Sequence, residues 1–222
     1  MKKSSSNIIH NKEKITLKII LLGSINVGKS SLINRYINGK FIQTRPTIGV
    51  DFATKVIESE ELIINLQIYD TAGTEKYHYQ LGSQFYRNAD GAILVYDLSR
   101  PAKDSLDQLM KWKDEVLTKS YVAGDNDFKL PIVVAGNKAD LKTNDNDDND
   151  IIHNFCKDND YGHIETSAKD SFQVEAAVLA VTSLALTQHR KKKDKRVVDP
   201  NIINLNDLYK KKQDNADCFG CS

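Results

Sequence analysis

The sequence predicts an α/β fold in a single doubly wound domain, and three observations support this class. Residues 92–96 (AILVY) and 132–135 (IVVA) are short, almost continuous apolar runs, which are typical of parallel strands buried on both faces. Apolar residues also recur at helical spacing within residues 106–117 and 174–185. A glycine-containing loop at residues 23–30 separates a β-branched run from a helical segment. Strands that alternate with helices in this way build an open sheet that helices cover.

The elements follow one another in a regular order. Strands are predicted at residues 16–22, 62–69, 92–96 and 132–135, with a weaker candidate at 162–165. Helices are predicted at residues 29–37, after Pro101 with Leu106, Leu109, Met110, Val116 and Leu117 at helical spacing, and near the end with Val174, Ala177, Val178, Val181, Leu184 and Ala185. Packing in the core accounts for both apolar stripes.

Length and charge indicate one domain with two extensions. A chain of 222 residues, 40% hydrophobic, is long enough for one buried core and short for two. We expect a basic N-terminal extension at 1–14, a domain at 15–188 and a flexible tail at 189–222. The extension carries four Lys against one Glu and the tail nine Lys/Arg against five Asp, while the net charge is only +1. Basic ends on a mildly acidic domain suit an anionic surface.

Cysteine usage and hydropathy indicate a reducing compartment. Two of the three cysteines, Cys218 and Cys221, lie in the last five residues, which is not the framework of a disulfide-stabilised secreted domain. No apolar stretch approaches the roughly 18 residues that span a bilayer. We therefore expect a cytoplasmic protein that reaches membranes through its tail. The Asn/Asp-rich residues 142–150 are interpreted as a solvated loop, with cation binding as the alternative.

Residues 23–30 (GSINVGKS) match the pattern G-x-x-x-x-G-K-[ST] between a strand and a helix. Backbone N–H groups of such a loop cradle phosphate oxygens, and the helix N-terminus adds to the positive potential. Lys29 would reach the β and γ phosphates and Ser30 would ligate Mg²⁺. A purely structural glycine turn is the alternative.

Two further motifs follow predicted strands. Asp70 can lie beside the Mg²⁺ of the phosphate loop, and the amide of Gly73 can approach a γ-phosphate. Residues 137–140 (NKAD) offer the amide of Asn137 and the carboxylate of Asp140 to a base edge. A carboxylate accepts two hydrogen bonds from N1 and the exocyclic amine of guanine, a donor pair that adenine lacks. Alone, NKAD could be an ordinary turn; following the other motifs, it predicts guanine.

Together, GSINVGKSS, Pro46-Thr47, DTAG, NKAD and ETSAK (165–169) resemble the Ras-like small GTPases over about residues 17–189. Within that superfamily, IGVDF (48–52), LQIYD (66–70), FYRNAD (85–90) and LVYDLS (94–99) resemble Rab proteins. TIGVDFATKVI and the segment from residue 97 to 116 are most similar to Rabs of late endosomes and lysosomes. The resemblance implies a P-loop GTPase domain with a mostly parallel six-stranded sheet.

The resemblance also implies roles for individual residues. Thr47 would close on Mg²⁺ and the γ-phosphate, and Mg²⁺ would be held by Ser30, Thr47 and Asp70. Catalysis would involve Lys29, Thr47, Gly73 and the position of Thr74. GTP or GDP would be bound by Gly23, Ser24, Ile25, Asn26, Val27, Gly28, Lys29, Ser30, Ser31, Phe41, Thr47, Asp70, Gly73, Asn137, Lys138, Asp140, Ser167, Ala168 and Lys169. Effectors would read Ile48 and the aromatic residues Phe52, Tyr69 and Phe85; filling of the core is the alternative for Phe85.

The chain departs from the family pattern at several of these positions. Thr74 stands where the family has the Gln that orients the attacking water, and Ile25 stands where Gly or Ser is usual. Tyr69 replaces a usual Trp. The segment 41–47 is one residue short and lacks the Tyr often found there.

Two functions are consistent with these motifs. The first is a Rab-like GTP/GDP switch for vesicle trafficking with slow intrinsic hydrolysis; the second is a GTP-loaded effector-binding module whose hydrolysis is negligible, favoured by Ile25 and Thr74. The resemblance implies effectors, an exchange factor, a GTPase-activating protein, an escort protein and a dissociation inhibitor as partners of a monomer. Nucleic acid is disfavoured because aromatic residues do not interleave with the basic charges.

The tail indicates peripheral attachment to the cytosolic face of intracellular membranes, and the resemblance suggests endosomes or lysosomes. Residues 190–196 (RKKKDKR) suit an anionic leaflet, with a solvated linker as the alternative. Residues 203–205 (INL) resemble the element of Rab tails that engages the escort protein, or match it by chance. Cys218 and Cys221 would carry one or two prenyl groups, although CFGCS is neither C-a-a-X nor a terminal CC or CXC.

Overall fold

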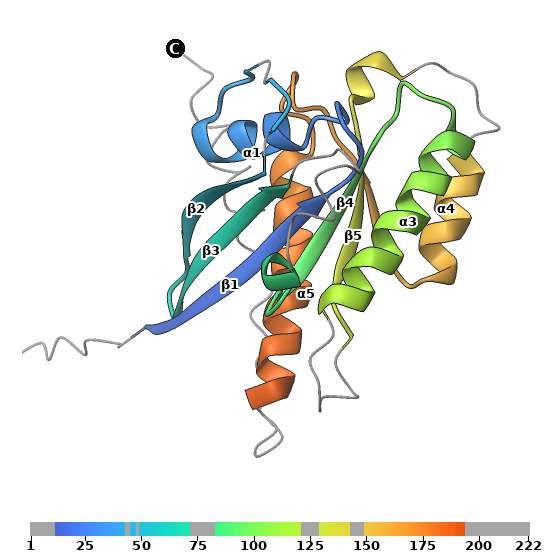
Figure 1. Cartoon of the computed structure of the whole chain (residues 1–222). Helices are drawn as coiled ribbons and strands as arrows, with labels where there is room; N and C mark the ends of the chain where they lie inside the picture. The colour runs from blue at the N-terminus through green and yellow to red at the C-terminus, as the bar shows by residue number, and fades with distance from the viewer. Residues whose placement is uncertain are drawn as a thin grey trace, which may run out of the picture.

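The computed structural model describes residues 12–42, 45–47, 49–71, 83–120, 129–142 and 149–193. Its centre is a six-stranded sheet with the order β2-β3-β1-β4-β5-β6 (Figure 1). The strands are β1 (Glu13–Leu22), β2 (Val50–Glu58), β3 (Leu62–Thr71), β4 (Gly91–Asp97), β5 (Ile132–Asn137) and β6 (Gly162–Glu165). Only the pair β2–β3 is antiparallel, and the other neighbours run parallel. The predicted class, an α/β P-loop fold with a mostly parallel sheet, is confirmed.

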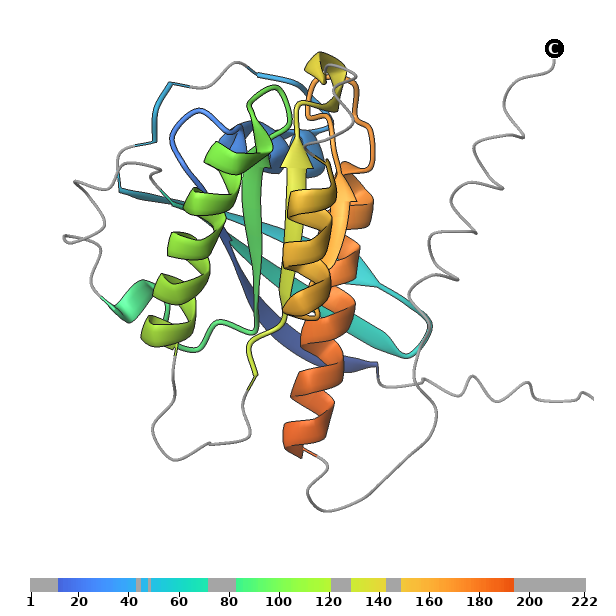
Figure 2. The ribbon, with the colours of Figure 1, turned by 90° about the vertical axis from the view of Figure 1, so that its right-hand side faces the viewer.

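Helices cover both faces of the sheet, as Figures 1 and 2 show. The described helices are α1 (Lys29–Asn38), α3 (Ala102–Ser120), α4 (Asn149–Asp158) and α5 (Val174–Lys193), with the short 3-10 turns η1 (Ser83–Phe85) and η2 (Ala139–Leu141). None of the helices in the described ranges is both long enough and apolar enough to span a bilayer.

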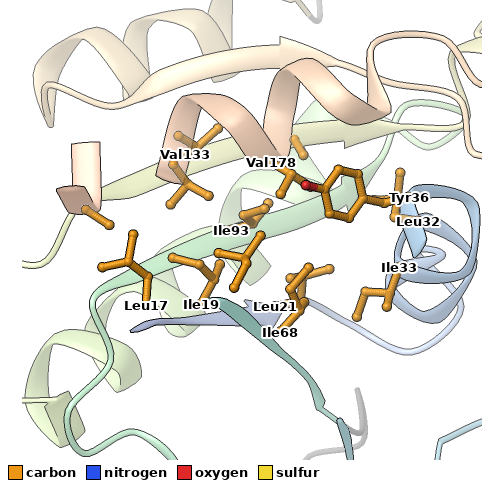
Figure 3. Close-up of a cluster of buried hydrophobic side chains, with 14 of the residues drawn as sticks. Leu17, Ile19, Leu21, Leu32, Ile33, Tyr36, Ile68, Ile93, Val133 and Val178 are labelled. Atoms are coloured by element: carbon orange, nitrogen blue, oxygen red, sulfur yellow. The ribbon is translucent and has the colours of Figure 1, made fainter. Parts of the chain in front are cut away.

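Strand β1 divides its side chains between two cores. Leu17, Ile19 and Leu21 pack under α1 and α5 (Figure 3), whereas Ile20 and Leu22 pack under α3 and α4. Successive side chains of a strand point to opposite faces, so a strand covered on both faces must be apolar without alternation. That requirement explains the continuous apolar run.

Two elements were not predicted from hydrophobic periodicity. Strand β2 lies at the edge of the sheet and is half exposed, so its pattern is weaker than that of a buried strand. Helix α4 begins at Asn149, so the last two residues of the segment interpreted as a solvated loop are helical. Asn and Asp are favoured at a helix N-terminus because they cap backbone N–H groups and complement the helix dipole.

The predicted end of the last helix and three predicted core residues need correction. Helix α5 continues to Lys193, because Lys and Arg are good helix formers and are favourable near a helix C-terminus; residues 189–193 are therefore helical rather than part of a flexible tail. Met110, Leu117 and Leu184 were predicted in the core, but they are exposed.

Candidate functional site

The loop between β1 and α1 requires glycine at both ends. Gly23 has φ +150, and a Cβ there would lie 2.2 Å from the carbonyl oxygen of Val95. Gly28 has φ +96, and a Cβ there would lie 2.3 Å from Nδ2 of Asn137. Residues that carry a side chain rarely adopt either backbone conformation. The loop can therefore curl tightly only with these glycines, which leaves its backbone N–H groups free to face an anion.

Lys29, the first residue of α1, is buried beside this loop. Its Nζ donates to the carbonyl oxygens of Gly23 at 2.7 Å and Ser24 at 3.0 Å. Burial lowers the pKa of the Lys29 ammonium to about 8, although the Asp70 carboxylate opposes the shift. A buried cation held mainly by carbonyls is stabilised further by a bound anion, so this position suits a phosphate group.

Three side-chain oxygens gather where β3 ends beside the start of α1. Oγ of Ser30 lies 2.8 Å from Oγ1 of Thr47 and donates to Oδ2 of Asp70. Oγ1 of Thr47 also donates to Oδ2 of Asp70 at 3.2 Å. Burial raises the pKa of the Asp70 carboxyl, against hydrogen bonds from Ser30 and Thr47 and the charge of Lys29.

This oxygen cluster fits Mg²⁺. Oδ1 of Asp70 is buried and has no hydrogen-bond partner among the described residues, which leaves an anionic oxygen for a cation. Mg²⁺ takes oxygen ligands at about 2.0–2.1 Å in an octahedron, which places neighbouring oxygens about 2.9 Å apart. The spacing of the Ser30 and Thr47 hydroxyls is close to that value, and these three side chains could hold the ion together with substrate phosphates.

Asn137, at the end of β5, bonds to protein groups in this structure. Its Nδ2 donates to the carbonyl of Val27 at 2.8 Å, and its Oδ1 accepts from the backbone N–H of Ala168 at 3.2 Å. The side chain therefore ties the phosphate loop to the loop after β6. The sequence predicts this amide at a base edge, but the long-range pairing of the two loops has no local sequence signal.

Asp140 is the remaining acceptor for a base. Its Oδ1 accepts from Oγ of Ser167 at 2.7 Å, and its Oδ2 lies 3.7 Å from Nζ of Lys169. Asp140, Ala168 and Lys169 line one open cleft together with the phosphate-loop residues. A carboxylate oriented at the mouth of this cleft can accept hydrogen bonds from a base that has two adjacent donors.

Lys138 is held away from Asp140 by a different carboxylate. It adopts a left-handed conformation with φ 67, and its Nζ donates to Oδ2 of Asp97 at 2.6 Å. Burial tends to raise the pKa of Asp97, but the hydrogen bonds from Lys138 and Ser99 lower it overall. This ion pair fixes the backbone that carries Asp140.

The cleft brings most of the predicted residues together. It is lined by Ile25, Asn26, Gly28, Lys29, Ser30, Ser31, Phe41, Arg45, Pro46, Thr47, Asn137, Lys138, Asp140, Leu141, Ala168 and Lys169. Phe41 is 45% exposed at its border, where a ring can cover a base, and Ile25 is 38% exposed. The predicted residues Gly23, Ser24, Val27, Asp70 and Ser167 are not among the lining residues. Oγ of Ser24 donates to Oε1 of Gln108 at 3.2 Å. Ile48, Gly73, Thr74, Cys218 and Cys221 fall outside the described residues.

Sequence reasoning missed Arg35 and Arg45. Arg35 of α1 donates to the carbonyls of Ala168 at 2.8 Å, Lys169 at 2.7 Å and Gly39 at 2.6 Å. It thereby fastens the loop after β6 to the helix that follows the phosphate loop. No local motif marks the contacts with Ala168 and Lys169, because these residues are more than 130 positions away. Arg45 directly precedes the Pro46-Thr47 motif but belongs to no motif itself, so the sequence carries no signal for it.

Two of the three expected effector aromatics lie side by side. Phe52 on β2 and Tyr69 on β3 are cross-strand neighbours with ring centroids 5.0 Å apart, and Phe52 is 49% exposed. Nζ of Lys18 lies 4.7 Å from the centroid of the Tyr69 ring. Phe85 is half-buried and packs against the core under α3, so core filling accounts for part of its surface.

A phosphate loop, an oxygen cluster for Mg²⁺ and a carboxylate at a base pocket define a P-loop nucleotide-binding protein. Comparisons with known proteins agree with this class. The family model described as Ras family matches residues 18–187. Rab-7b of Paramecium octaurelia is 38% identical over 91% of this chain and 96% of its own length. Rab7 of Drosophila melanogaster is 40% identical over 79% of this chain and 83% of its own length, and RABG3b of Arabidopsis thaliana is 36% identical over 81% and 88%.

The chain therefore belongs to the Ras family and is a Rab-family small GTPase. Proteins of this family bind GTP and GDP and hydrolyse GTP.

Proposed function

We propose that this protein is a GTP/GDP switch for vesicle trafficking that acts on the cytosolic face of endosomal or lysosomal membranes. The observation that carries the proposal is the cleft in which Lys29, the Ser30–Thr47–Asp70 oxygen cluster and Asp140 meet. Such a cleft suits a guanine nucleotide with Mg²⁺. Thr47 connects the metal to the segment 41–47, so loss of the γ-phosphate would release that segment. The resemblance to Rab7 proteins supports the compartment.

Intrinsic hydrolysis is slow in this proposal, and Thr74 is the main reason. A Gln amide both donates to and accepts from the attacking water, whereas the Thr hydroxyl stops at the γ position of a shorter side chain. If the loss resembles that of one preorganised polar group, the barrier rises by about 3 kcal/mol, roughly a hundredfold in rate. This part of the proposal rests on the sequence, because Thr74 lies outside the described residues.

Ile25 gives a second reason, and it favours the alternative function. Its β-branched side chain is exposed and lines the cleft, where the arginine of an activating protein would enter. If entry is blocked, the protein is a GTP-loaded module that binds effectors without turnover. An activating protein that supplies its own Gln as well as Arg would bypass Thr74 only if Ile25 leaves room.

The test is the identity of the nucleotide on the purified protein, followed by single-turnover hydrolysis. Wild type, Thr74→Gln and Thr74→Gln with Ile25→Gly are each loaded with GTP, with and without an activating domain. We expect Thr74→Gln to accelerate intrinsic hydrolysis by roughly a hundredfold, and Ile25→Gly to add a response to the activating domain. Wild-type hydrolysis as fast as that of Thr74→Gln would refute the role of Thr74. If wild type shows no measurable hydrolysis either with or without the activating domain, the result would favour the GTP-loaded module.

The partners in this proposal follow the family. Effectors read Phe52, Tyr69 and the exposed part of Phe85, together with Ile48. An exchange factor, an activating protein, an escort protein and a dissociation inhibitor act on the monomer. Prenyl groups on Cys218 and Cys221, with the basic cluster 190–196, attach it to the membrane.

A further inference from the structure

Four cationic side chains line the nucleotide cleft, and Arg45 differs from the other three. Lys29 donates to two carbonyls of the phosphate loop. Lys138 pairs with Asp97 at 2.6 Å, and Lys169 lies 3.7 Å from Asp140. Arg45 is exposed, lines the same cleft, and has no hydrogen bond or ion pair with any described residue. Its guanidinium is therefore the cleft cation that is free to take an anionic partner from a ligand.

The backbone around Arg45 links its position to that of Thr47. Pro46 has a fixed φ and disfavours helical conformation in the residue before it, so Arg45 is biased towards an extended backbone. In an extended segment, side chains two positions apart point to the same side. Both Arg45 and Thr47 line the cleft, as this geometry requires.

The short stretch of chain between Arg45 and Thr47 allows the Arg45 guanidinium to reach the phosphates of a bound nucleotide. Two residues of extended chain span at most about 7 Å, and Oγ1 of Thr47 is 2.8 Å from the Ser30 hydroxyl beside the expected metal. Because Thr47 already lies beside Ser30 and Asp70, Arg45 is held near the same end of the cleft. Arg is well suited to this place because its planar fork can donate two parallel hydrogen bonds to a phosphoryl group.

We propose that Arg45 contacts the γ-phosphoryl group of bound GTP and stabilises its transfer to water from within the same chain. This inference rests on the proposed function, since it assigns a further catalytic residue to the same cleft. In the reaction, the water oxygen bonds to the γ-phosphorus while the bond from that phosphorus to the bridging oxygen breaks. The bridging oxygen leaves with the electron pair as part of GDP, and the proton from water ends on inorganic phosphate. Arg45 donates hydrogen bonds to the oxygens that gain negative charge and exchanges no proton.

This role of Arg45 differs from the water-orienting task that Thr74 leaves undone. A guanidinium stabilises charge on the transferred group but does not orient the water. Arg45 therefore supports residual hydrolysis and retention of the triphosphate without replacing the missing Gln.

The proposal is tested with Arg45→Gln, Arg45→Lys and the matched control Lys40→Gln in the full chain. Lys40 is exposed and lies five positions earlier, but it does not line the cleft, so its replacement removes the same charge without the contact. Release of fluorescent GDP and of a fluorescent non-hydrolysable GTP analogue is measured by stopped flow, and GTP hydrolysis is measured in single turnover. Binding of aluminium fluoride to the GDP form gives a readout of transition-state charge that needs no turnover.

Arg45→Gln removes a charge-assisted hydrogen bond to the γ-phosphoryl group. We expect it to release the GTP analogue faster, and to hydrolyse GTP more slowly, by roughly tenfold to a hundredfold in each case. GDP release should change by less than about twofold, because GDP lacks the γ-phosphoryl group. Arg45→Lys should lie between wild type and Arg45→Gln, and aluminium fluoride should bind wild type better than Arg45→Gln. Lys40→Gln should resemble wild type in every assay.

Two results would overturn the proposal. One is an equal effect of Arg45→Gln and Lys40→Gln, which would mean that the net positive charge of the segment acts on the nucleotide and that Arg45 makes no specific contact. The other is equal acceleration of GDP and GTP-analogue release, which would make Arg45 a structural part of the segment. If wild type hydrolyses GTP as fast as Thr74→Gln, the proposed slow switch fails while the ratio of release rates still decides on Arg45. Failure of wild type to bind guanine nucleotides would overturn both.

Discussion

The Asp140 carboxylate is charged and largely buried, yet it lines the nucleotide cleft. It can therefore discriminate between the bases of different nucleotides. Its side chain is held by the Ser167 hydroxyl and faces the ammonium of Lys169, so its carboxylate is oriented before any ligand enters. Preorganised acceptors of this kind discriminate strongly, because a ligand that lacks the matching donors leaves them unpaired.

We predict that Asp140→Asn weakens GTP binding by roughly tenfold or more and improves binding of xanthosine triphosphate. The amide replaces one acceptor by a donor, which no longer fits the exocyclic amine of guanine but fits the carbonyl of xanthine. Competition between the two nucleotides measures the change. Asp170→Asn is the control, because Asp170 is exposed in the loop after β6 and does not line the cleft. Unchanged guanine preference in Asp140→Asn would contradict the assignment of the base.

At the scale of elements, helix α1 connects the phosphate loop to the base pocket. It starts with Lys29 at the phosphate loop, and through Arg35 it holds the backbone of the loop after β6. The same loop is also tied to Asn137, whose Oδ1 accepts from the N–H of Ala168. Loss of either contact should therefore weaken the binding of both the phosphates and the base of a bound nucleotide.

We predict that Arg35→Ala accelerates GDP release by roughly tenfold, because hydrogen bonds to three backbone carbonyls are lost. Arg35→Lys should rescue only in part, since one ammonium cannot reproduce the fork of a guanidinium. Stopped-flow release of fluorescent GDP measures both. Asn38→Ala is the control on the same helix, since among the described residues the side-chain Nδ2 of Asn38 bonds only to Oδ1 of Asn34. If Arg35→Ala releases GDP like wild type, the helix does not restrain the loop.

A second inter-element contact joins β4 to β6 and makes stability depend on pH. Nε2 of His163 lies 2.9 Å from the hydroxyl of Tyr96, and the two rings stack with centroids 5.9 Å apart. Burial lowers the pKa of His163 below 6.5; Glu165 opposes this shift, while His153 and Lys142 add to it. The unfolded chain therefore binds the proton at higher pH than the folded chain does.

We predict that the free energy of unfolding is unaffected by His163 above its unfolded pKa and falls as the pH drops from about 6.5 through the lowered folded pKa. One proton contributes at most about 1.4 kcal/mol per pH unit. Thermal unfolding between pH 7.5 and 5 measures the slope. His163→Gln, which keeps a polar partner for Tyr96, should flatten it. An identical slope in both proteins would assign the pH dependence to other groups.

In the whole molecule, basic clusters and the proposed lipidation sites belong to the ends of the chain, while the nucleotide site lies in the domain. The parallel strands end at one edge of the sheet, where the phosphate loop, Asp70 and Asn137 meet, as in other open α/β sheets. The basic cluster 190–196 begins in the last turn of α5, at Arg190. A membrane can thus be engaged without occupying the cleft.

We predict that the double variant Cys218→Ser/Cys221→Ser moves from the membrane fraction to the cytosol, since a domain that carries only a basic cluster and no lipid binds a membrane weakly. Cell fractionation measures the distribution, and mass spectrometry of the C-terminal peptide identifies the modification. Cys156→Ala is the control, because the third cysteine is buried in the domain. Free thiols on both tail cysteines of the native protein would contradict prenylation.

The fold class and the chemistry of the phosphate end can be predicted from the sequence alone. Residues 23–30 act as one contiguous loop, so Gly23, Gly28, Lys29 and Ser30 can be assigned from their spacing alone. Asp70 and Asp140 could be assigned because Asp70 lies at the end of β3 and Asp140 follows β5, and such ends converge in a parallel sheet.

The tertiary structure decided what depends on contacts between distant segments. It paired β2 with β3 at the edge of the sheet, gave Asn137 partners in two loops, and placed Arg35 on the backbone of Ala168. It also brought Arg45 into the cleft without a partner among the described residues. Spacing along the chain encodes local geometry, whereas these contacts depend on how the whole sheet and its helices pack, and no short motif carries that information.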